Sequence, residues 1–178
     1  MPQMTKIKLD RNNVLQLASE YDKIFSEKSD GKIEKELIGW FSYHKYLDRK
    51  NFLKLCMWKS QRPKKHYENK LNSDFRVREI TKLAVGSKDE YLKISVLQLL
   101  KGVSWPVASV ILHFAEPDKY IIMDFRAIWS LGIQQPKAYD FDFWINYMRT
   151  VKSIAKKMKV TLRTLDKALW MYSKLNQK

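Results

Sequence analysis

Apolar residues along this chain recur at intervals of three and four, and no alternating run of apolar and polar residues exceeds a few positions. This spacing is typical of amphipathic α-helices and not of β-strands. Only five glycines and five prolines occur in the 178 residues, as expected for helices joined by short turns. The pattern predicts an all-α fold in one globular unit that spans residues 1–178.

Capping residues and breaks set the expected ends of these helices. The first two helices are predicted at 12–27 and 33–46, with Gly31 as the break between them. Ser87 and Glu90 have the spacing of a capping box, which predicts a helix from there to Leu100. The other helices are predicted at 48–58, 72–86, 106–115, 125–131, 140–154 and 161–175. Their expected N-caps are Asp48, Asn72 or Ser73, Asp124, Asp140 or Asp142, and Thr161.

The sequence KGVSW, residues 101–105, leaves few positions to reverse the chain between two of these helices. Gly102 can adopt backbone angles that other residues resist, Ser104 or Trp105 can cap the next helix, and Pro106 suits its first turn. Free amides at a helix N-terminus attract anions, and a phosphate is the natural anion for a basic protein. The alternative is an ordinary connection between two helices.

A single acid follows the next helix. Residues 107–115 are apolar on nearly every side, which predicts a helix buried between others. The chain then passes through Pro117 and the apolar residues YIIM to Asp124, directly before the short helix predicted in FRAIWSLG. Asp124 therefore occupies an N-cap position, and capping alone is enough to explain its residue type.

Residues 100–132 resemble the helix-hairpin-helix–Gly/Pro-Asp superfamily of base-excision DNA glycosylases. The matching positions are Leu100, Gly102, Val103, Ala108, Pro117 and Asp124, and they lie within about 33 of the 178 residues. The resemblance implies two helical lobes that flank a cleft, a hairpin that holds the DNA backbone, and base flipping. It also implies that Asp124 is the catalytic carboxylate, which stabilises positive charge on the sugar as the base leaves.

The hairpin departs from that family at two positions. Pro106 stands where bifunctional members carry a Schiff-base lysine, so a monofunctional enzyme that uses water is expected. Ser104 stands where the family usually has its second hairpin glycine; a positive φ at that position would strain a serine and weaken phosphate contact. No cofactor is expected, apart from a monovalent cation that the resemblance allows on the hairpin carbonyls.

Charge points to the same class of partner. Thirty-four Lys and Arg against nineteen Asp and Glu give a net charge of +15, which favours a polyanion such as nucleic acid. The resemblance implies that this nucleic acid is duplex DNA. An acidic protein or a membrane surface is the alternative. Residues 45–70 alone carry a charge of +7. The residues expected to contact DNA are Gly102, Val103, Ser104, Trp105, Arg62, Lys64, Lys65 and Arg126.

Several classes of site are excluded or disfavoured. Cys56 is the only cysteine, so an internal disulfide and a four-thiolate iron–sulfur cluster are excluded and a reduced cytoplasm is expected. His44, His66 and His113 lack metal-site spacing, and His113 is expected to be a hydrogen-bonded core residue. No paired carboxylates are apparent at catalytic spacing, and Trp58 is expected in the core. No secretion signal or membrane segment is expected, and the protein is expected to be a monomer.

The sequence therefore favours a monofunctional DNA glycosylase that flips and hydrolytically removes a damaged or mispaired base. The main alternative is a non-catalytic helix-hairpin-helix module that binds nucleic acid, in which Asp124 acts only as a helix cap.

Overall fold

The computed structural model describes residues 6–7, 10–25 and 29–177, and this part of the chain contains helices and no strand. The all-α prediction is confirmed. None of the helices in these ranges combines the length and apolar character needed to cross a bilayer. The helices are α1 (Arg11–Phe25), α2 (Ser29–Tyr43), α3 (Arg49–Lys59), α4 (Lys64–Tyr67), α5 (Asp74–Gly86), α6 (Glu90–Leu97), α7 (Trp105–Ala115), α8 (Phe125–Ser130), α9 (Phe141–Met158) and α10 (Leu162–Asn176).

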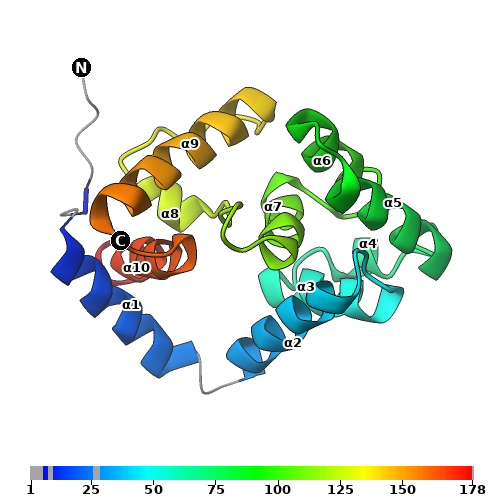
Figure 1. Ribbon diagram of the computed structural model, residues 1–178, viewed down its shortest axis with the longest axis horizontal. Helices are drawn as coiled ribbons and strands as arrows, with labels where there is room; N and C mark the ends of the chain where they lie inside the picture. The colour runs from blue at the N-terminus through cyan, green and yellow to red at the C-terminus, as the bar shows by residue number, and fades with distance from the viewer. Residues whose placement is uncertain (1–5, 8–9, 26–28, 178) are drawn as a thin grey trace.

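The helices form two groups (Figure 1). Helices α1, α8, α9 and α10 lie together on one side, and α2 to α7 lie together on the other. Helix α10 packs against α1, α8 and α9, whereas α7 packs against α2, α3, α5 and α6. Because α7 is surrounded, every residue from Val107 to Phe114 is buried, as its almost wholly apolar sequence predicts.

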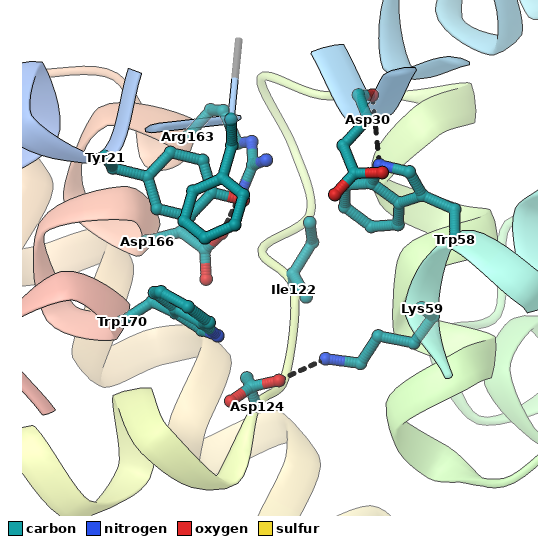
Figure 2. A pocket seen from close by; sticks show the side chains of 10 residues that line it. Tyr21, Asp30, Trp58, Lys59, Ile122, Asp124, Arg163, Asp166 and Trp170 are labelled. Atoms are coloured by element: carbon teal, nitrogen blue, oxygen red, sulfur yellow. Dashed lines mark hydrogen bonds and ion pairs between the residues drawn. The ribbon is translucent and has the colours of Figure 1, made fainter. Parts of the chain in front are cut away.

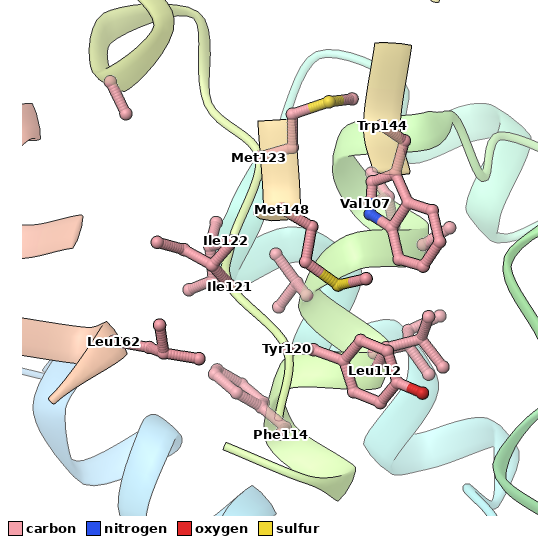
Figure 3. Close-up of a cluster of buried hydrophobic side chains, with 14 of the residues drawn as sticks. Val107, Leu112, Phe114, Tyr120, Ile121, Ile122, Met123, Trp144, Met148 and Leu162 are labelled. Carbon is pink, nitrogen blue, oxygen red and sulfur yellow. The ribbon is translucent and has the colours of Figure 1, made fainter. Parts of the chain in front are cut away.

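A segment without regular secondary structure, residues 120–124, leads from the α7 group to α8. Its residues 120–123 are buried in an apolar cluster with side chains of α7, α9 and α10 (Figure 3). Side chains of α7 and α9 bond to this backbone: Ser109 Oγ accepts from Met123 N at 2.8 Å, and Tyr147 Oη donates to Ile122 O at 3.3 Å. The path of the chain up to Asp124 is therefore fixed by burial and by hydrogen bonds.

The hairpin between α6 and α7 turns at Gly102, whose φ is +86°. Ser104 has φ −91° and ψ 172° and is the N-cap of α7, without a side-chain capping bond. The strain considered for Ser104 is absent because Gly102 supplies the left-handed residue of this turn. Pro106 lies in the first turn of α7, as predicted.

Asn72 ties this hairpin to the rest of its group. Its buried amide donates to Tyr67 O at 2.9 Å and to Lys101 O at 3.0 Å, and its Oδ1 accepts from Lys101 N at 2.8 Å. One side chain thus joins the end of α4 to the hairpin turn. Asn72 is a clamp and not the N-cap of α5, a role that Ser73 takes.

Most predicted caps are confirmed, and three details of the helix prediction are wrong. The side chains of Asp48, Ser73, Asp124, Asp140 and Thr161 each accept an N-terminal amide of the following helix. Asp89 caps α6 in place of Ser87, whose hydroxyl instead accepts from Asp89 N. Gly31 lies inside α2, and the short helix α4 was not predicted. The predicted end of the first helix, residues 26–27, lies outside the described residues.

Replacing Gly102 with alanine is expected to destabilise the fold. A Cβ there would lie 2.7 Å from Tyr67 Cδ1 and 2.9 Å from His66 Cβ, and the positive φ adds backbone strain. We expect a loss of roughly 2–4 kcal/mol in the free energy of unfolding, measured with urea. Gly39→Ala is the matched control, because Gly39 lies within α2 with no atom within 4 Å of a Cβ; it should gain about 0.5–1 kcal/mol. Equal effects would contradict the close approach at the hairpin.

Candidate functional site

Each carboxylate oxygen of Asp124 has a hydrogen-bond partner, one in its own helix α8 and one in α3. Its Oδ1 accepts the backbone N–H of Arg126 at 2.9 Å, which caps α8. Its Oδ2 accepts from Lys59 Nζ at 2.5 Å, across the gap between α8 and the end of α3. The carboxylate side chain is 14% exposed and the lysine side chain 11%. The acid is therefore not sealed in the core, and it is held by groups from both sides.

Asp124 opens into a half-enclosed pocket of about 150 Å³ between the two groups of helices (Figure 2). One wall carries Tyr21, Arg163, Asp166 and Trp170, and the facing wall carries Asp30, Trp58 and Lys59. Ile122 of the buried segment lies between the walls, and Phe25 completes the lining. A cavity of about this volume in another protein accommodates a benzene ring, so the pocket is large enough for a flat ring system.

The aromatic walls are braced by ring contacts. Trp170 packs edge-on against Tyr21 and Phe25 of α1, with centroids 5.4 Å and 5.2 Å away. Trp58 packs against Phe114 with its centroid 5.0 Å away, and its Nε1 donates to Asp30 O at 3.1 Å. The prediction that Trp58 is a core residue is incomplete, because the same ring is only partly buried and lines the pocket.

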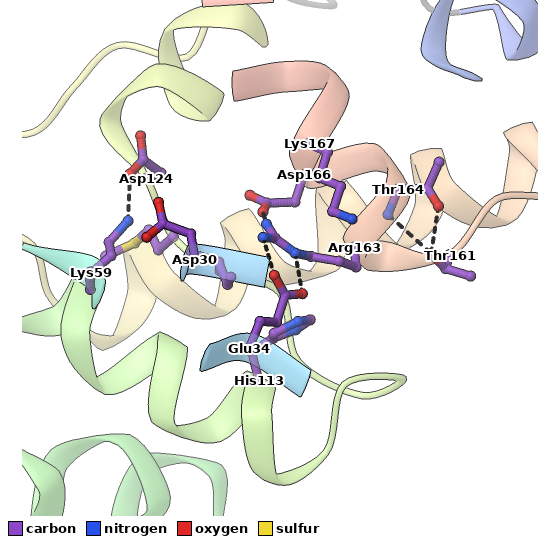
Figure 4. Close-up of polar contacts among 12 residues, drawn as sticks. Asp30, Glu34, Lys59, His113, Asp124, Thr161, Arg163, Thr164, Asp166 and Lys167 are labelled. Carbon is purple, nitrogen blue, oxygen red and sulfur yellow. Dashed lines mark hydrogen bonds and ion pairs between the residues drawn. The ribbon is translucent and has the colours of Figure 1, made fainter. Parts of the chain in front are cut away.

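Arg163 joins the two groups of helices behind this pocket (Figure 4). From α10 its guanidinium donates two hydrogen bonds of 2.7 Å to Glu34 of α2, and a further one to Asp166. Burial works to raise the pKa of Glu34, but the hydrogen bonds and charge of Arg163 outweigh it and lower this pKa. Bidentate geometry of this kind holds both partners in a fixed orientation.

Asp166 is a second pocket carboxylate that the sequence analysis missed. It is 3% exposed, and its Oδ1 has no hydrogen-bond partner. Burial raises the pKa of Asp166 to about 6, with the charge of Arg163 acting in the opposite direction. Sequence spacing indicated no paired carboxylates, whereas the fold places Asp124 and Asp166 in the lining of one pocket. The sequence does indicate this residue in one way: Asp166 is an acid on the apolar stripe of the last helix, one turn beyond Leu162.

The predicted DNA-contacting residues occupy a neighbouring surface. Arg62, Lys64 and Lys65 are exposed at and before α4. Helix α4 lies against the hairpin, since Tyr67 and His66 are the side chains that approach Gly102. Only residues 60–63 separate α4 from Lys59 at the pocket.

The other hairpin residues differ in what they offer a ligand. Ser104 is exposed, whereas Val103 is buried and its amide donates to Leu100 O at 3.1 Å, so that amide is already used in the turn. Trp105 is partly buried and packs on the core. Arg126 lies over the Trp170 ring at 5.3 Å, and no ion pair of Arg126 is found within the described ranges. Arg126 therefore packs on a ring that lines the pocket.

His113 is a buried core residue, as predicted. It is 1% exposed, and its Nδ1 lies 2.7 Å from Tyr120 O. Burial lowers the pKa of His113 to about 4, so the ring is neutral at pH 7 and donates from Nδ1 to this carbonyl. Among residues 6–7, 10–25 and 29–177, no group of three or more His, Cys, Asp or Glu side chains is arranged to hold a metal ion.

No family model, curated protein or solved structure matches this chain.

Removing Arg163 is expected to destabilise the protein strongly. Arg163→Met leaves two carboxylates at a largely buried site without their cation, so we expect a loss of about 3–5 kcal/mol in the free energy of unfolding. Lys167→Met, one turn further along α10, removes a pair with the half-exposed Asp22 and should cost at most about 1 kcal/mol. Urea denaturation of both variants measures the difference, and similar losses would argue against Arg163 as the link between the two groups.

Stability should depend on pH through two buried groups, His113 and Asp166, whose pKa values shift in opposite directions on folding. The pKa of His113 is lower in the folded state than in the unfolded state, so unfolded chains bind the extra proton and stability falls by about 3 kcal/mol as pH drops from 6.5 to 4. The pKa of Asp166 is raised on folding, so this residue contributes stability that increases as pH drops from 6 towards 4.

The two contributions can be separated by substitution. Relative to the parent protein, His113→Gln should remove the loss at low pH, and Asp166→Asn should remove the gain. The free energy of unfolding, measured from pH 4.5 to 7, should therefore change slope in opposite directions in the two variants. Changes of the same sign would contradict the protonation states described here.

Proposed function

We propose that this protein is a base-excision DNA glycosylase of the helix-hairpin-helix–Gly/Pro-Asp type, which binds duplex DNA and takes one base out of the helix. The observation that carries the proposal is that Asp124 opens into a ring-sized, aromatic-walled pocket instead of the packed core. A cap alone requires no such pocket. The two groups of helices on either side of the pocket support the two-lobed arrangement of that superfamily.

The pocket offers the contacts that a flipped base needs. Flipped bases are held by stacking between aromatic side chains and by hydrogen bonds to their polar edges. Trp170, Tyr21 and Trp58 provide rings, and Asp166 provides an unpartnered carboxyl oxygen to accept or donate a hydrogen bond. The pKa of Asp166 near 6 makes its protonation state sensitive to what occupies the pocket.

Asp124 has the chemistry for base release. As the bond between base and sugar breaks, positive charge develops on the sugar, and a carboxylate held nearby stabilises it. The hydrogen bond from Arg126 N fixes the orientation of Asp124, so little reorganisation is needed when the charge forms. This role is the same whichever nucleophile then bonds to the sugar C1′ atom.

DNA binding is supported by the charge beside the pocket. The net charge of +15 favours a polyanion, and the exposed Lys64 and Lys65 lie on α4, next to the hairpin. Phosphates bound along this surface would bring a neighbouring base towards Asp124.

The alternative function is a nucleic-acid-binding module without catalysis. The observation in its favour is that both oxygens of Asp124 already have partners, Arg126 N and Lys59 Nζ.

Asp124→Asn separates these two functions. The variant keeps an oxygen that can cap α8 but loses the charge, so base release should fall roughly 100- to 10,000-fold while affinity for duplex DNA stays within about twofold. Base release is measured on a panel of duplexes that contain single damaged or mispaired bases, with alkali to reveal abasic sites. Asp140→Asn is the matched control, since Asp140 caps α9 away from the pocket, and it should leave base release unchanged. Absence of release by the parent protein across the panel would favour the binding module.

A further inference from the structure

Helices α5 and α6 leave apolar side chains open to solvent, on the side of their group that faces away from α1 and α10 (Figure 1). Within the described ranges, six of the ten exposed large apolar side chains lie in residues 71–99. They are Leu71, Phe75, Leu83, Tyr91, Leu92 and Leu99. Scattered apolar residues are normal on a protein surface, whereas a contiguous group of them marks a site of interaction.

The two helices run antiparallel and enclose a groove. Arg76, near the start of α5, donates from Nη2 to Leu99 O at 3.2 Å, just beyond the end of α6. Leu83, near the end of α5, lines one hollow together with Leu92, near the start of α6. This hollow has a volume of about 450 Å³, and Gly86 forms part of its lining. The exposed leucines of the two helices therefore share one surface, which we call the α5–α6 groove.

The α5–α6 groove has the dimensions of a docked α-helix. The outer face of α5 carries positions 75, 79, 82 and 86, which are spaced three or four residues apart and so lie on one side of the helix. At 1.5 Å per residue this face is about 16 Å long, or about three helical turns. A helix bound in such a groove inserts apolar side chains at positions i, i+3 or i+4, and i+7. Gly86 leaves room for one of them, since no atom lies within 4 Å of a Cβ built there.

Positive charge borders the groove. Lys82 lines it and Lys88 follows α5; both are exposed, and neither has an ion pair among the residues that the structure describes. Glu79 is the one acid among the residues that line the hollow. Three other nearby acids already have partners, namely Asp74 with Arg78, Glu90 with Lys119, and Asp89 with the amide of Leu92. The complementary occupant is therefore acidic beside its apolar stripe.

Two other occupants fit these residues less well. In a twofold dimer the same patch meets itself, so Lys82 and Lys88 would lie near the equivalent lysines of a second copy, and each copy carries a net charge of +15. Duplex DNA is bound mainly through polar and charged contacts to its phosphates, whereas Leu83, Leu92 and Gly86 offer an apolar floor.

We propose that the α5–α6 groove binds an amphipathic α-helix of a partner protein, whose apolar stripe fills the groove and whose acidic flanks meet Lys82 and Lys88. This interaction goes beyond the proposed function and does not depend on it, because the groove and the pocket at Asp124 share no lining residue.

The probe is a fluorescent synthetic peptide of about 16 residues, with leucines at i, i+3, i+4 and i+7 and with glutamate or alanine elsewhere. Its binding to the full chain is followed by fluorescence anisotropy at about 0.15 M salt. We expect a dissociation constant on the order of 1–100 μM. A scrambled peptide keeps the charge but loses the stripe, and a peptide with lysine in place of glutamate keeps the stripe but reverses the charge. Both should bind at least roughly tenfold more weakly.

Gly86→Gln fills the groove without disturbing the fold. The open space around a Cβ at this last residue of α5 accommodates the side chain, which then occupies part of the hollow. Affinity for the acidic peptide should fall at least roughly tenfold, while the midpoint of thermal unfolding stays at or above that of the parent. Gly39→Gln is the matched control, because Gly39 lies within α2 and has an equally open Cβ position; it should leave the affinity unchanged.

Two further variants test the apolar and the charged contacts separately. Leu92→Gln should weaken binding of the acidic peptide about 5- to 20-fold, whereas Leu15→Gln on α1 should not, although Leu15 is 41% exposed and Leu92 is 42% exposed. Lys82→Glu should weaken the acidic peptide and strengthen the lysine peptide, each about threefold or more. Lys157→Glu makes the same change in net charge on α9 and should alter neither affinity by more than about twofold.

Several results would overturn the inference. The first is absence of saturable binding by the acidic peptide, or binding of the scrambled peptide with equal affinity, which would reduce the interaction to net charge. Equal affinities of Gly86→Gln and Gly39→Gln would place the peptide elsewhere. A dimer of the parent protein that Gly86→Gln converts to monomers in sedimentation equilibrium would assign the groove to a second copy. Loss of duplex affinity in Gly86→Gln, without a change in peptide binding, would assign it to DNA.

The proposed function and this inference fail separately. Asp124→Asn should leave peptide binding unchanged, because Asp124 lies in the other hollow. Gly86→Gln should likewise leave base release unchanged.

Discussion

The pocket depends on one guanidinium shared between two groups of helices. Arg163 projects from α10 and holds Glu34 of α2 in a bidentate pair, with Asp166 as a third partner. Loss of any one of the three charges destabilises such a site strongly, because each charge is costly when it is buried without the others. The pair between Lys59 and Asp124 crosses the same gap at the pocket mouth. These two bridges connect the two groups of helices on either side of the pocket.

The buried segment between the two groups of helices, residues 120–123, also fixes the position of Asp124. Residues 120–123 are buried and hydrogen-bonded by side chains of α7 and α9, so Asp124 emerges at a fixed point between the groups. Asn72 fixes the hairpin in a similar way, by bonding α4 to the turn at Gly102. Buried polar contacts thus hold both the segment that leads to Asp124 and the hairpin. Such contacts favour one arrangement, because a buried polar group left without its partner costs free energy.

A strongly basic protein gathers several of its few acids at one place. Asp30, Asp124 and Asp166 line the pocket and Glu34 lies behind it, whereas the exposed lysines lie outside on α4. This separation of charge fits a surface that binds phosphates and an interior in which positive charge develops on a sugar. Lys59 lies at the pocket and pairs with Asp124.

By itself the sequence determined the all-α class, most helix caps and the buried character of α7, because spacing of apolar residues and capping are local properties. It also singled out Asp124 and Gly102. Only the tertiary structure brought Lys59 to Asp124, placed Asp166 in the same pocket and paired Arg163 with Glu34, residues separated by 65, 42 and 129 positions along the chain. Such contacts follow from how helices pack, and the periodicity of one helix carries no information about which residue of another will face it.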